Sequence, residues 1–198
     1  MDTKEKIMQA AVELFQSQGF NGTSVRMIAE KAQVNVSLVS YYFGSKKGLL
    51  ETLIVQFFEG YVQKLEQIAS ETEREQCLPR LMKMIEAGLS YQHDNMYLSR
   101  FVQREITLNT MLVREIMSTY LTKEKYLFYQ VLKKGMERKE IKKQPIDIVI
   151  IQIRSLLTMP YLQPQYIHEV HHRYVQDRFF LNEYYRYLER LIKNALAV

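Results

Sequence analysis

Cysteine is almost absent from the sequence, since Cys77 is the one such residue among 198. A chain with one cysteine forms no internal disulfide and holds no Cys-x-x-Cys pair, so a reducing compartment suits it. Long apolar runs are also missing, because IVII at residues 148–151 is far shorter than the roughly 20 residues that span a bilayer. The stretch MDTKEKIMQAA lacks the apolar core of a signal peptide. We therefore expect a soluble, cytoplasmic protein.

The motifs of common catalytic sites are missing as well. The sequence contains no glycine-rich phosphate loop, no nucleophile elbow and no strong metal-binding motif. We therefore expect no catalytic residue, no metal and no cofactor, and we do not expect an enzyme. The net charge of +5 and the isoelectric point of about 9.1 suit an anionic partner without identifying one.

Helical spacing dominates the chain, whereas the alternating pattern of a half-buried strand never persists beyond a few residues. The first apolar stripe consists of Ile7, Ala10, Ala11, Leu14 and Phe15. Similar stripes recur to the end of the sequence. The fold class is therefore expected to be all-α, with about nine helices and small helices at the N-terminus.

Local signals predict where the helices begin and end. Asp2 and Glu5 have the spacing of a capping box, and Gly19 should end the first helix. Thr23 and Asn35 are good N-caps for two short helices. Later helices are expected from Lys46 onward and over 79–93, 95–107, 110–138, 145–159 and 174–196, with Pro160 and Pro164 bracketing a break before the last one.

The stretch VSLVSYYF at residues 36–43 predicts a short helix with two different faces. Val39 and Phe43 share one face, which can dock on the two preceding helices. Such a helix can enter the major groove of DNA because its outer side chains are small, and their hydroxyls bond base edges or phosphates. Leu38 can also touch a thymine methyl. The outer face carries Ser37, Leu38, Ser40 and Tyr41.

Aromatic and basic side chains follow this face. The hydroxyls of Tyr41 and Tyr42 can reach phosphate oxygens, and Lys46 adds a cation where the next helix begins. Alternatively, the tyrosines are core aromatics of a small bundle and Lys46 is a solvated charge. Residues 36–43 contain no Arg, Lys or Gln, so bidentate reading of a base is expected mostly from Arg26.

Residues 23–50 resemble the DNA-binding segment of the TetR family of regulators. The resemblance is carried by Thr23, Ile28, Ala29, Ala32, Val34, Tyr41, Phe43, Ser45, Lys46 and Leu49. It implies a helix-turn-helix domain over residues 1–45 that binds double-stranded DNA, with tyrosines and a lysine on phosphates. The residues expected to contact DNA are Thr23, Arg26, Val36, Ser37, Leu38, Ser40, Tyr41, Tyr42 and Lys46.

The sequence departs from the family pattern at three places. Gln33 stands where the family has a turn glycine, so we expect a different backbone geometry there. Asn35 replaces a serine, which exchanges one N-cap for another. Ser37 and Leu38 replace a Gly-Thr pair, and this leaves the preferred bases open.

Two helices near the C-terminus carry apolar seams. In the TetR family the last two long helices form the dimer, so the resemblance implies a homodimer on a near-palindromic site. The alternative is that both helices pack in the core of one subunit. The residues expected at the dimer interface are Val149, Ile153, Leu156, Leu181, Tyr184, Tyr185, Leu188, Leu191 and Ile192.

Residues 46–198 are expected to form the regulatory and dimerisation domain. A pocket for an unknown small-molecule effector would be lined by Met82, Ile85, Tyr97, Phe101, Met117, Tyr120 and Phe128, although core packing explains these residues equally well. A narrower resemblance, over residues 34–61, is to RefZ-type division and sporulation regulators of Bacillus-like bacteria within the same family. It implies an alternative function, in which the protein binds DNA near the chromosome origin as part of the nucleoid and acts on FtsZ.

Overall fold

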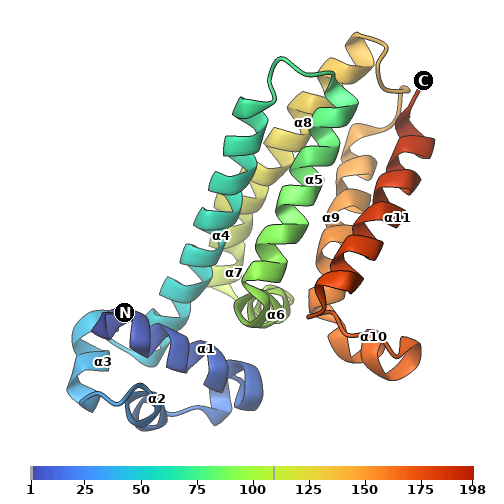
Figure 1. Ribbon diagram of the computed structural model, residues 1–198. Coiled ribbons are helices and arrows are strands. Elements are labelled where there is room, and N and C mark those ends of the chain that lie inside the picture. The colour runs from blue at the N-terminus through green and yellow to red at the C-terminus, as the bar shows by residue number, and fades with distance from the viewer. Residues whose placement is uncertain (1, 109) are drawn as a thin grey trace.

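The computed structural model describes residues 2–108 and 110–198, and these ranges are helical almost throughout (Figure 1). They contain no strand, only one isolated bridge between Ile141 and Ala197. The expected all-α fold is confirmed. The elements are α1 (Thr3–Gly22), α2 (Val25–Ala32), α3 (Val36–Phe43), α4 (Lys46–Glu71), α5 (Cys77–Asp94), α6 (Met96–Glu105), α7 (Met111–Ile116), the π-helical turn η1 (Met117–Leu121), α8 (Thr122–Glu137), α9 (Ile146–Leu162), α10 (Pro164–His171) and α11 (Arg178–Leu196).

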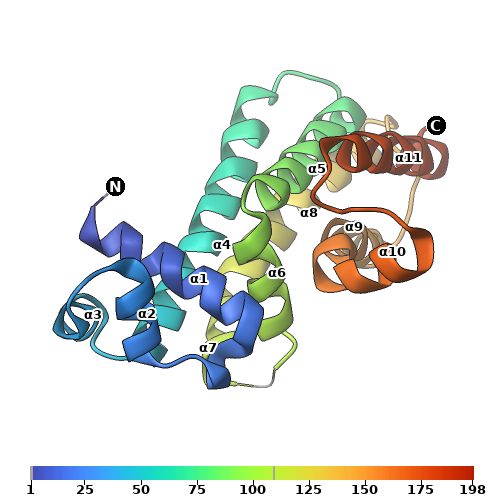
Figure 2. The ribbon, with the colours of Figure 1, turned by 60° about the horizontal axis from the view of Figure 1, so that its bottom comes forward.

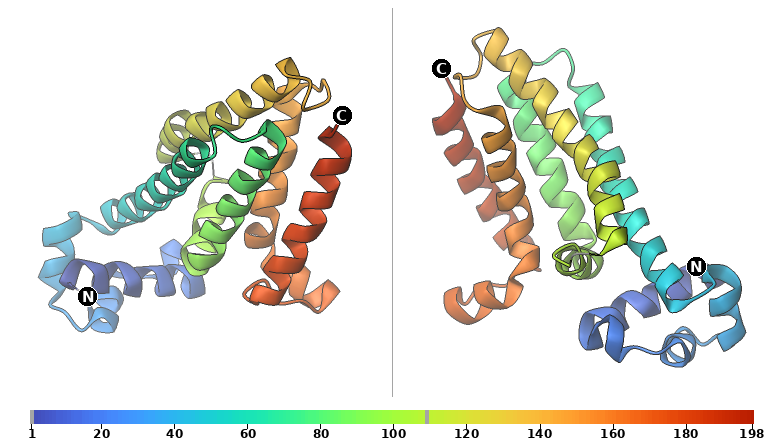
Figure 3. Two further views of the ribbon diagram at one scale, coloured as in Figure 1. Left: turned by 45° about the horizontal axis from the view of Figure 1, so that its top comes forward. Right: turned by 180° about the vertical axis from the view of Figure 1, so that it is seen from behind.

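The molecule has a small N-terminal bundle, α1–α3, and a larger C-terminal bundle, with α4 running from one into the other (Figures 1 and 3). Each bundle has its own apolar core. Leu49, Leu53 and Phe57 of α4 belong to the N-terminal core, whereas Tyr61 and Leu65 belong to the C-terminal core. Since α4 serves both cores, a domain boundary after residue 45 stays a prediction.

The first helix begins as expected and kinks at Gly19, where its end was expected. The side chain of Asp2 accepts a hydrogen bond from the Glu5 amide (2.7 Å), and the Glu5 carboxylate accepts one from the Asp2 amide (2.9 Å). This is a complete capping box. Gly19 breaks the helix with φ of +75°, a conformation that costs glycine little. One further turn follows it, up to Gly22.

Thr23 does not cap α2. Its hydroxyl donates to the Gly19 carbonyl (2.8 Å) and its side chain is buried, with 2% exposure. The N-cap is the next residue, Ser24, whose hydroxyl accepts from the Met27 amide (3.2 Å). The prediction was wrong by one residue because two hydroxyl residues are adjacent and only the fold decides which one is buried.

The turn between α2 and α3 keeps the left-handed geometry that glycine favours, contrary to our expectation. Gln33 adopts φ of +56° and ψ of +45°, and its amide closes α2 on the Glu30 carbonyl (3.0 Å). A non-glycine residue reaches this region at a cost of about 1–2 kcal/mol, which the packed helices on both sides offset. Asn35 is the N-cap of α3, as predicted, and accepts from the Ser37 amide (2.9 Å).

The C-terminal bundle contains more helical segments than the sequence indicated within the described ranges. The expected helix over 110–138 is divided by η1 into α7 and α8. The expected break between the two prolines is reduced to Gln163, and an unexpected helix, α10, starts at Pro164, because a proline at the first helical position loses no hydrogen bond. The last helix begins at Arg178, four residues later than predicted.

Pro160 lies inside α9, which runs on to Leu162. A proline cannot donate to the carbonyl four residues earlier, so the Leu156 oxygen loses its helical partner. The Tyr184 hydroxyl of α11 donates to that oxygen (2.7 Å). A side chain from another helix therefore replaces the missing donor, which explains why α9 continues through its proline.

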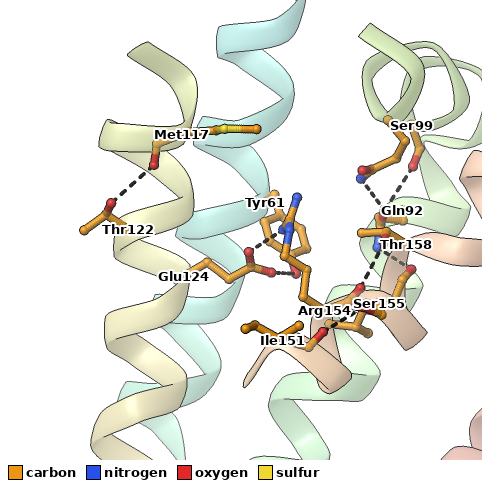
Figure 4. Close-up of polar contacts among 12 residues, drawn as sticks. Tyr61, Gln92, Ser99, Met117, Thr122, Glu124, Ile151, Arg154, Ser155 and Thr158 are labelled. Atoms are coloured by element: carbon orange, nitrogen blue, oxygen red, sulfur yellow. Dashed lines mark hydrogen bonds and ion pairs between the residues drawn. The ribbon is translucent and has the colours of Figure 1, made fainter. Parts of the chain in front are cut away.

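Two polar networks tie the C-terminal helices together (Figure 4). The buried Glu124 of α8 accepts a hydrogen bond from Tyr61 of α4 (2.7 Å) and forms an ion pair with Arg154 of α9. Burial, and then the Glu124 charge, raise the pKa of Tyr61 well above its ordinary value. In the second network, Gln92 of α5 donates to the Leu157 carbonyl (2.9 Å) and accepts from Gln103 of α6 (2.9 Å). Both networks satisfy polar groups inside the bundle.

We predict that the protein loses stability in alkaline solution through its buried tyrosines. Burial raises the pKa of Tyr184 to about 12, whereas a tyrosine in the unfolded chain ionises near pH ~10. Above pH ~10 the unfolded state loses a proton that the folded state keeps, so the free energy of unfolding falls as the pH rises towards 12. Urea unfolding at pH 8 and at pH ~11 measures this slope.

Tyr184→Phe should lower the free energy of unfolding at pH 8 by about 1–3 kcal/mol, because it leaves the Leu156 carbonyl without a donor. It should also make the alkaline decline shallower. The matched control is Tyr97→Phe, which removes a hydroxyl from a ring that is 59% exposed and should not change stability at pH 8. An unchanged stability in Tyr184→Phe would contradict the account of Pro160.

Candidate nucleic-acid interface

The outer face of α3 is uncharged and open. Val36 is 44% exposed and Tyr41 is 80% exposed, and Ser37 and Ser40 are exposed between them. On the inner face, Val39 and Phe43 are buried in the N-terminal core, as predicted. Leu38 differs from the prediction, because it is half-buried and packs against that core. The surface that α3 offers to a partner therefore consists of Val36, Ser37, Ser40 and Tyr41.

The angle between α3 and α4 is fixed by a tight turn. Gly44 has φ of +71°, and the Ser45 hydroxyl caps α4 by accepting from the Gly48 amide (3.0 Å). A Cβ atom on Gly48 would collide with the Phe43 carbonyl oxygen. Glycine at position 48 is therefore required for α4 to start this close to the end of α3.

Two tyrosines stand at the C-terminal end of α3. The rings of Tyr41 and Tyr42 meet edge to face, with centroids 5.1 Å apart, and Tyr42 is 40% exposed. Within the described part of the chain neither hydroxyl has a hydrogen-bond partner. Both are therefore free to bond an acceptor outside the protein, such as a phosphate oxygen.

Lys46 is engaged inside the protein. Its ammonium group donates to the carbonyl oxygens of Phe20 (2.8 Å) and Thr23 (2.7 Å), and it lies 4.3 Å from the centroid of the Phe20 ring. An ammonium group has three N–H donors, so one remains for a phosphate. Local sequence patterns do not predict these bonds, because they join residues that are 26 and 23 positions apart.

Of the remaining two residues expected to contact DNA, Arg26 is exposed and Thr23 is buried. Arg26 is exposed on α2, as an interface residue must be. The Thr23 side chain is buried and bonded to Gly19, so it is withdrawn from the surface, contrary to expectation. Sequence reasoning missed Ser24, whose exposed hydroxyl caps α2 two residues before Arg26.

Most residues expected at the dimer interface pack inside one subunit. Leu156, Tyr184 and Tyr185 are half-buried, and only Leu191, with 57% exposure, faces solvent. Five of the expected residues also line a groove between α9 and α11, so their part in a dimer interface stays a prediction; they are Val149, Ile153, Leu156, Leu191 and Ile192. The expected residues that belong to the C-terminal core are Val149, Ile153, Leu181, Leu188 and Ile192.

A second apolar surface remains on the outside of α9 and α11. Ile148 and Ile151 of α9 are 51% and 60% exposed, and Tyr187 of α11 is 61% exposed. A groove of about 490 Å³ runs beside them, between the two helices. Figure 1 shows α9 and α11 side by side at one edge of the molecule, where a second subunit has access.

Some of the residues expected to line an effector pocket are buried and others are exposed. Met82, Ile85, Phe101 and Phe128 are core residues, whereas Tyr97 and Met117 are exposed.

Among residues 2–108 and 110–198, no group of three or more His, Cys, Asp or Glu side chains could hold a metal ion. No helix in these ranges is both long and apolar enough to cross a membrane.

Comparison with known proteins gives a consistent result. The family model described as "Bacterial regulatory proteins, tetR family" matches residues 7–53, which run from α1 into α4. The "Probable HTH-type transcriptional regulator YttP" of Bacillus subtilis (strain 168) is 45% identical over 195 residues, which cover 98% of this chain and 94% of that protein.

Solved structures share the fold at low identity. The ketosteroid transcriptional regulator KstR2 of Mycobacterium tuberculosis has a TM-score of 0.82 and 16% identity, with 100% of this chain and 96% of that chain covered. A bacterial regulatory protein in the tetR family from Rhodococcus RHA1 has a TM-score of 0.79 and 17% identity, with 97% of both chains covered. The chain belongs to the tetR family of bacterial regulatory proteins, and it is a DNA-binding transcriptional regulator of that type.

Proposed function

We propose that the protein binds a near-palindromic DNA site as a homodimer and regulates transcription there. The observation that carries the proposal is the outer face of α3, which is exposed, uncharged and flanked by two free tyrosine hydroxyls. A helix with small side chains on its outer face fits the major groove closely.

The side chains of this face divide between base edges and the DNA backbone. Ser37 and Ser40 can bond base edges, and the Val36 methyl groups can touch a thymine methyl. Tyr41 and Tyr42 suit phosphates, which fix the position of the helix without reading sequence. Arg26 supplies the one side chain of the set that can bond a guanine with two hydrogen bonds.

The exposed apolar surface of α9 and α11 supports the homodimer. Ile148, Ile151, Tyr187 and Leu191 would stay in water in a single subunit, and an apolar surface of this kind marks an association site. Two helices from each subunit would form a four-helix bundle. The two α3 helices would then lie one DNA turn apart, about 34–36 Å, which makes the operator near-palindromic.

The role in cell division implied by the RefZ-type resemblance rests on that resemblance alone. The relatives named above are described as regulatory proteins, so we propose transcription as the output. Mapping the bound sites across a genome tests this choice. Sites at promoters whose transcripts change on deletion would support it, whereas scattered sites near the origin with unchanged transcripts would favour action on FtsZ. No small-molecule effector is assigned.

Arg26→Ala should weaken binding to the specific site more than binding to random duplex. The loss on the specific site is expected to be about 1–3 kcal/mol, the discrimination of one bidentate contact. Titrations of both duplexes at one salt concentration measure the difference. Arg74→Ala, which removes the same charge from the exposed loop before α5, is the control. Equal losses on both duplexes would make Arg26 a phosphate contact instead.

Substitutions of Lys46 and of Tyr41 should differ in their effects on stability and on DNA binding. Lys46→Met removes two charge-assisted hydrogen bonds to Phe20 and Thr23, so it should lower the free energy of unfolding by about 1–3 kcal/mol. Tyr41→Phe removes a free hydroxyl, so it should weaken binding to every duplex and shift stability by less than about 0.5 kcal/mol. Urea unfolding and DNA titration of each variant separate the two effects. A fully stable Lys46→Met variant that loses DNA binding would reduce Lys46 to a phosphate contact.

Replacing both Ile151 and Leu191 by glutamate should give a folded monomer, because carboxylates cannot be buried unpaired in an interface. Both side chains are more than half exposed in the single subunit, so its helix content should not change. Sedimentation and circular dichroism measure the two properties. Tyr97→Glu places the same charge on an exposed ring of α6 and should leave the dimer intact. A double variant that remains dimeric would exclude this surface.

A further inference from the structure

Two adjoining hollows lie on the seam between the N-terminal bundle and the end of α9. The larger, of about 380 Å³, is lined by residues of α1, α6, α9 and α10, and the smaller, of about 230 Å³, continues it along α10. Figure 2 shows α6 between α1 on one side and α9 with α10 on the other. The residues shared by both hollows are Arg100, Pro164 and Gln165. We refer to the pair as the seam cavity.

Three arginines and a histidine line the seam cavity. They are Arg100, Arg104, His168 and Arg173, whereas no Asp or Glu is among the described residues of its lining. Arg173 is paired with Glu183 and His168 with Glu169, both outside the lining. Arg104 donates to the Phe15 carbonyl (3.2 Å) and its Nε lies 4.0 Å from the Glu105 carboxylate. Three of the four side chains therefore have an acidic partner outside the lining.

Arg100 is the exception among these side chains. Within residues 2–108 and 110–198 it has no hydrogen-bond or ion-pair partner, although it is half-buried. A guanidinium that has lost part of its hydration gains most from a bidentate anion, either a phosphate or a carboxylate. The start of α10 adds to this, because Gln163 makes no side-chain cap and leaves the amides of the first turn without a capping acceptor.

The larger hollow also offers apolar surface. It comes from Leu162 and Tyr166, which are 39% and 46% exposed, whereas Phe101 and Tyr161 in its lining are 1% and 2% exposed. A single inorganic ion would leave this surface in contact with water. A molecule that joins an anionic group to an apolar body fills both parts, which is the usual composition of a small-molecule site.

We propose that the seam cavity binds a small organic anion, with a phosphate or carboxylate on Arg100 and an aromatic or aliphatic body against Leu162 and Tyr166. Gln16 of α1 lines the same hollow, so the ligand touches the DNA-binding bundle and the α9–α10 end of the C-terminal bundle at once. A ligand that contacts both favours one relative position of the two bundles. The binding itself goes beyond the proposed function and can be measured without DNA.

Calorimetry of the full chain with phenyl phosphate at constant ionic strength tests the proposal. The expected result is one saturable site per chain, with tighter binding than inorganic phosphate or phenol, which each carry half of the ligand. Arg100→Gln should weaken binding by about tenfold or more, the loss of one charge-assisted contact. The control Arg74→Gln removes an equal charge from an exposed loop and should bind as the wild type does.

Gln165→Glu provides a second variant that keeps Arg100. It places a carboxylate at an exposed position shared by both hollows, so it should abolish binding by repulsion while the fold is retained. The absence of saturable binding in the wild type, or equal binding in Arg100→Gln, overturns the proposal.

The phosphate on Arg100 could also come from the DNA backbone. DNA titrations of Arg100→Gln at several salt concentrations distinguish this source from a small molecule. The slope of the logarithm of the affinity against the logarithm of salt concentration should equal that of the wild type. A slope reduced by about one, with phenyl phosphate binding unchanged, would make Arg100 a contact to the DNA backbone and overturn the proposal. Neither result depends on whether the operator is palindromic, so this test and that of the proposed function fail independently.

Discussion

The ammonium group of Lys46 joins the two ends of the segment that would read DNA. By bonding the carbonyls of Phe20 and Thr23, it holds the last turn of α1 against the first turn of α4, and α2 and α3 lie between these points. The bond closes a loop of some twenty residues, whose ordering would otherwise cost conformational entropy. Because α4 continues into the C-terminal core, the same contact also sets the direction of α3 relative to the rest of the molecule. The position of the outer face of α3 thus depends on the polar contact of Lys46 with the end of α1.

Two helices, α4 and α6, link the bundles. α4 links them by apolar packing, since Phe57 and Tyr61, four residues apart, belong to different cores. α6 combines apolar and polar contacts, because its Phe101 stacks on the Phe15 ring of α1 (centroids 5.3 Å apart) and its Arg104 donates to the Phe15 carbonyl. Close packing and a directional hydrogen bond therefore meet at one residue of α1.

Features that depend on local spacing could be predicted from the sequence, whereas those that depend on a distant partner could not. The buried positions Val39 and Phe43 follow from helical periodicity, and the Asp2 capping box follows from spacing alone. The continuation of α9 through Pro160 depends on a hydroxyl from α11, and local rules favour a break there. The same limit explains α9 and α11 themselves. Both helices are apolar on two sides, and periodicity does not say which side faces the core of the subunit.

The composition of α3 bears on the proposed homodimer. If α3 enters the major groove as proposed, it makes no bidentate base contact of its own because it has no Arg, Lys or Gln, and each subunit would be limited to Arg26, hydroxyl bonds and methyl contacts. One bidentate contact gives about 1–3 kcal/mol of discrimination, whereas a specific site commonly exceeds random DNA by about 4–10 kcal/mol. Two subunits on a twofold site double the discrimination that comes from direct base contacts. The DNA between the half-sites adds discrimination through its shape and deformability. In the proposed complex, where so few side chains would read DNA, the second copy would therefore be needed for specificity as well as for affinity.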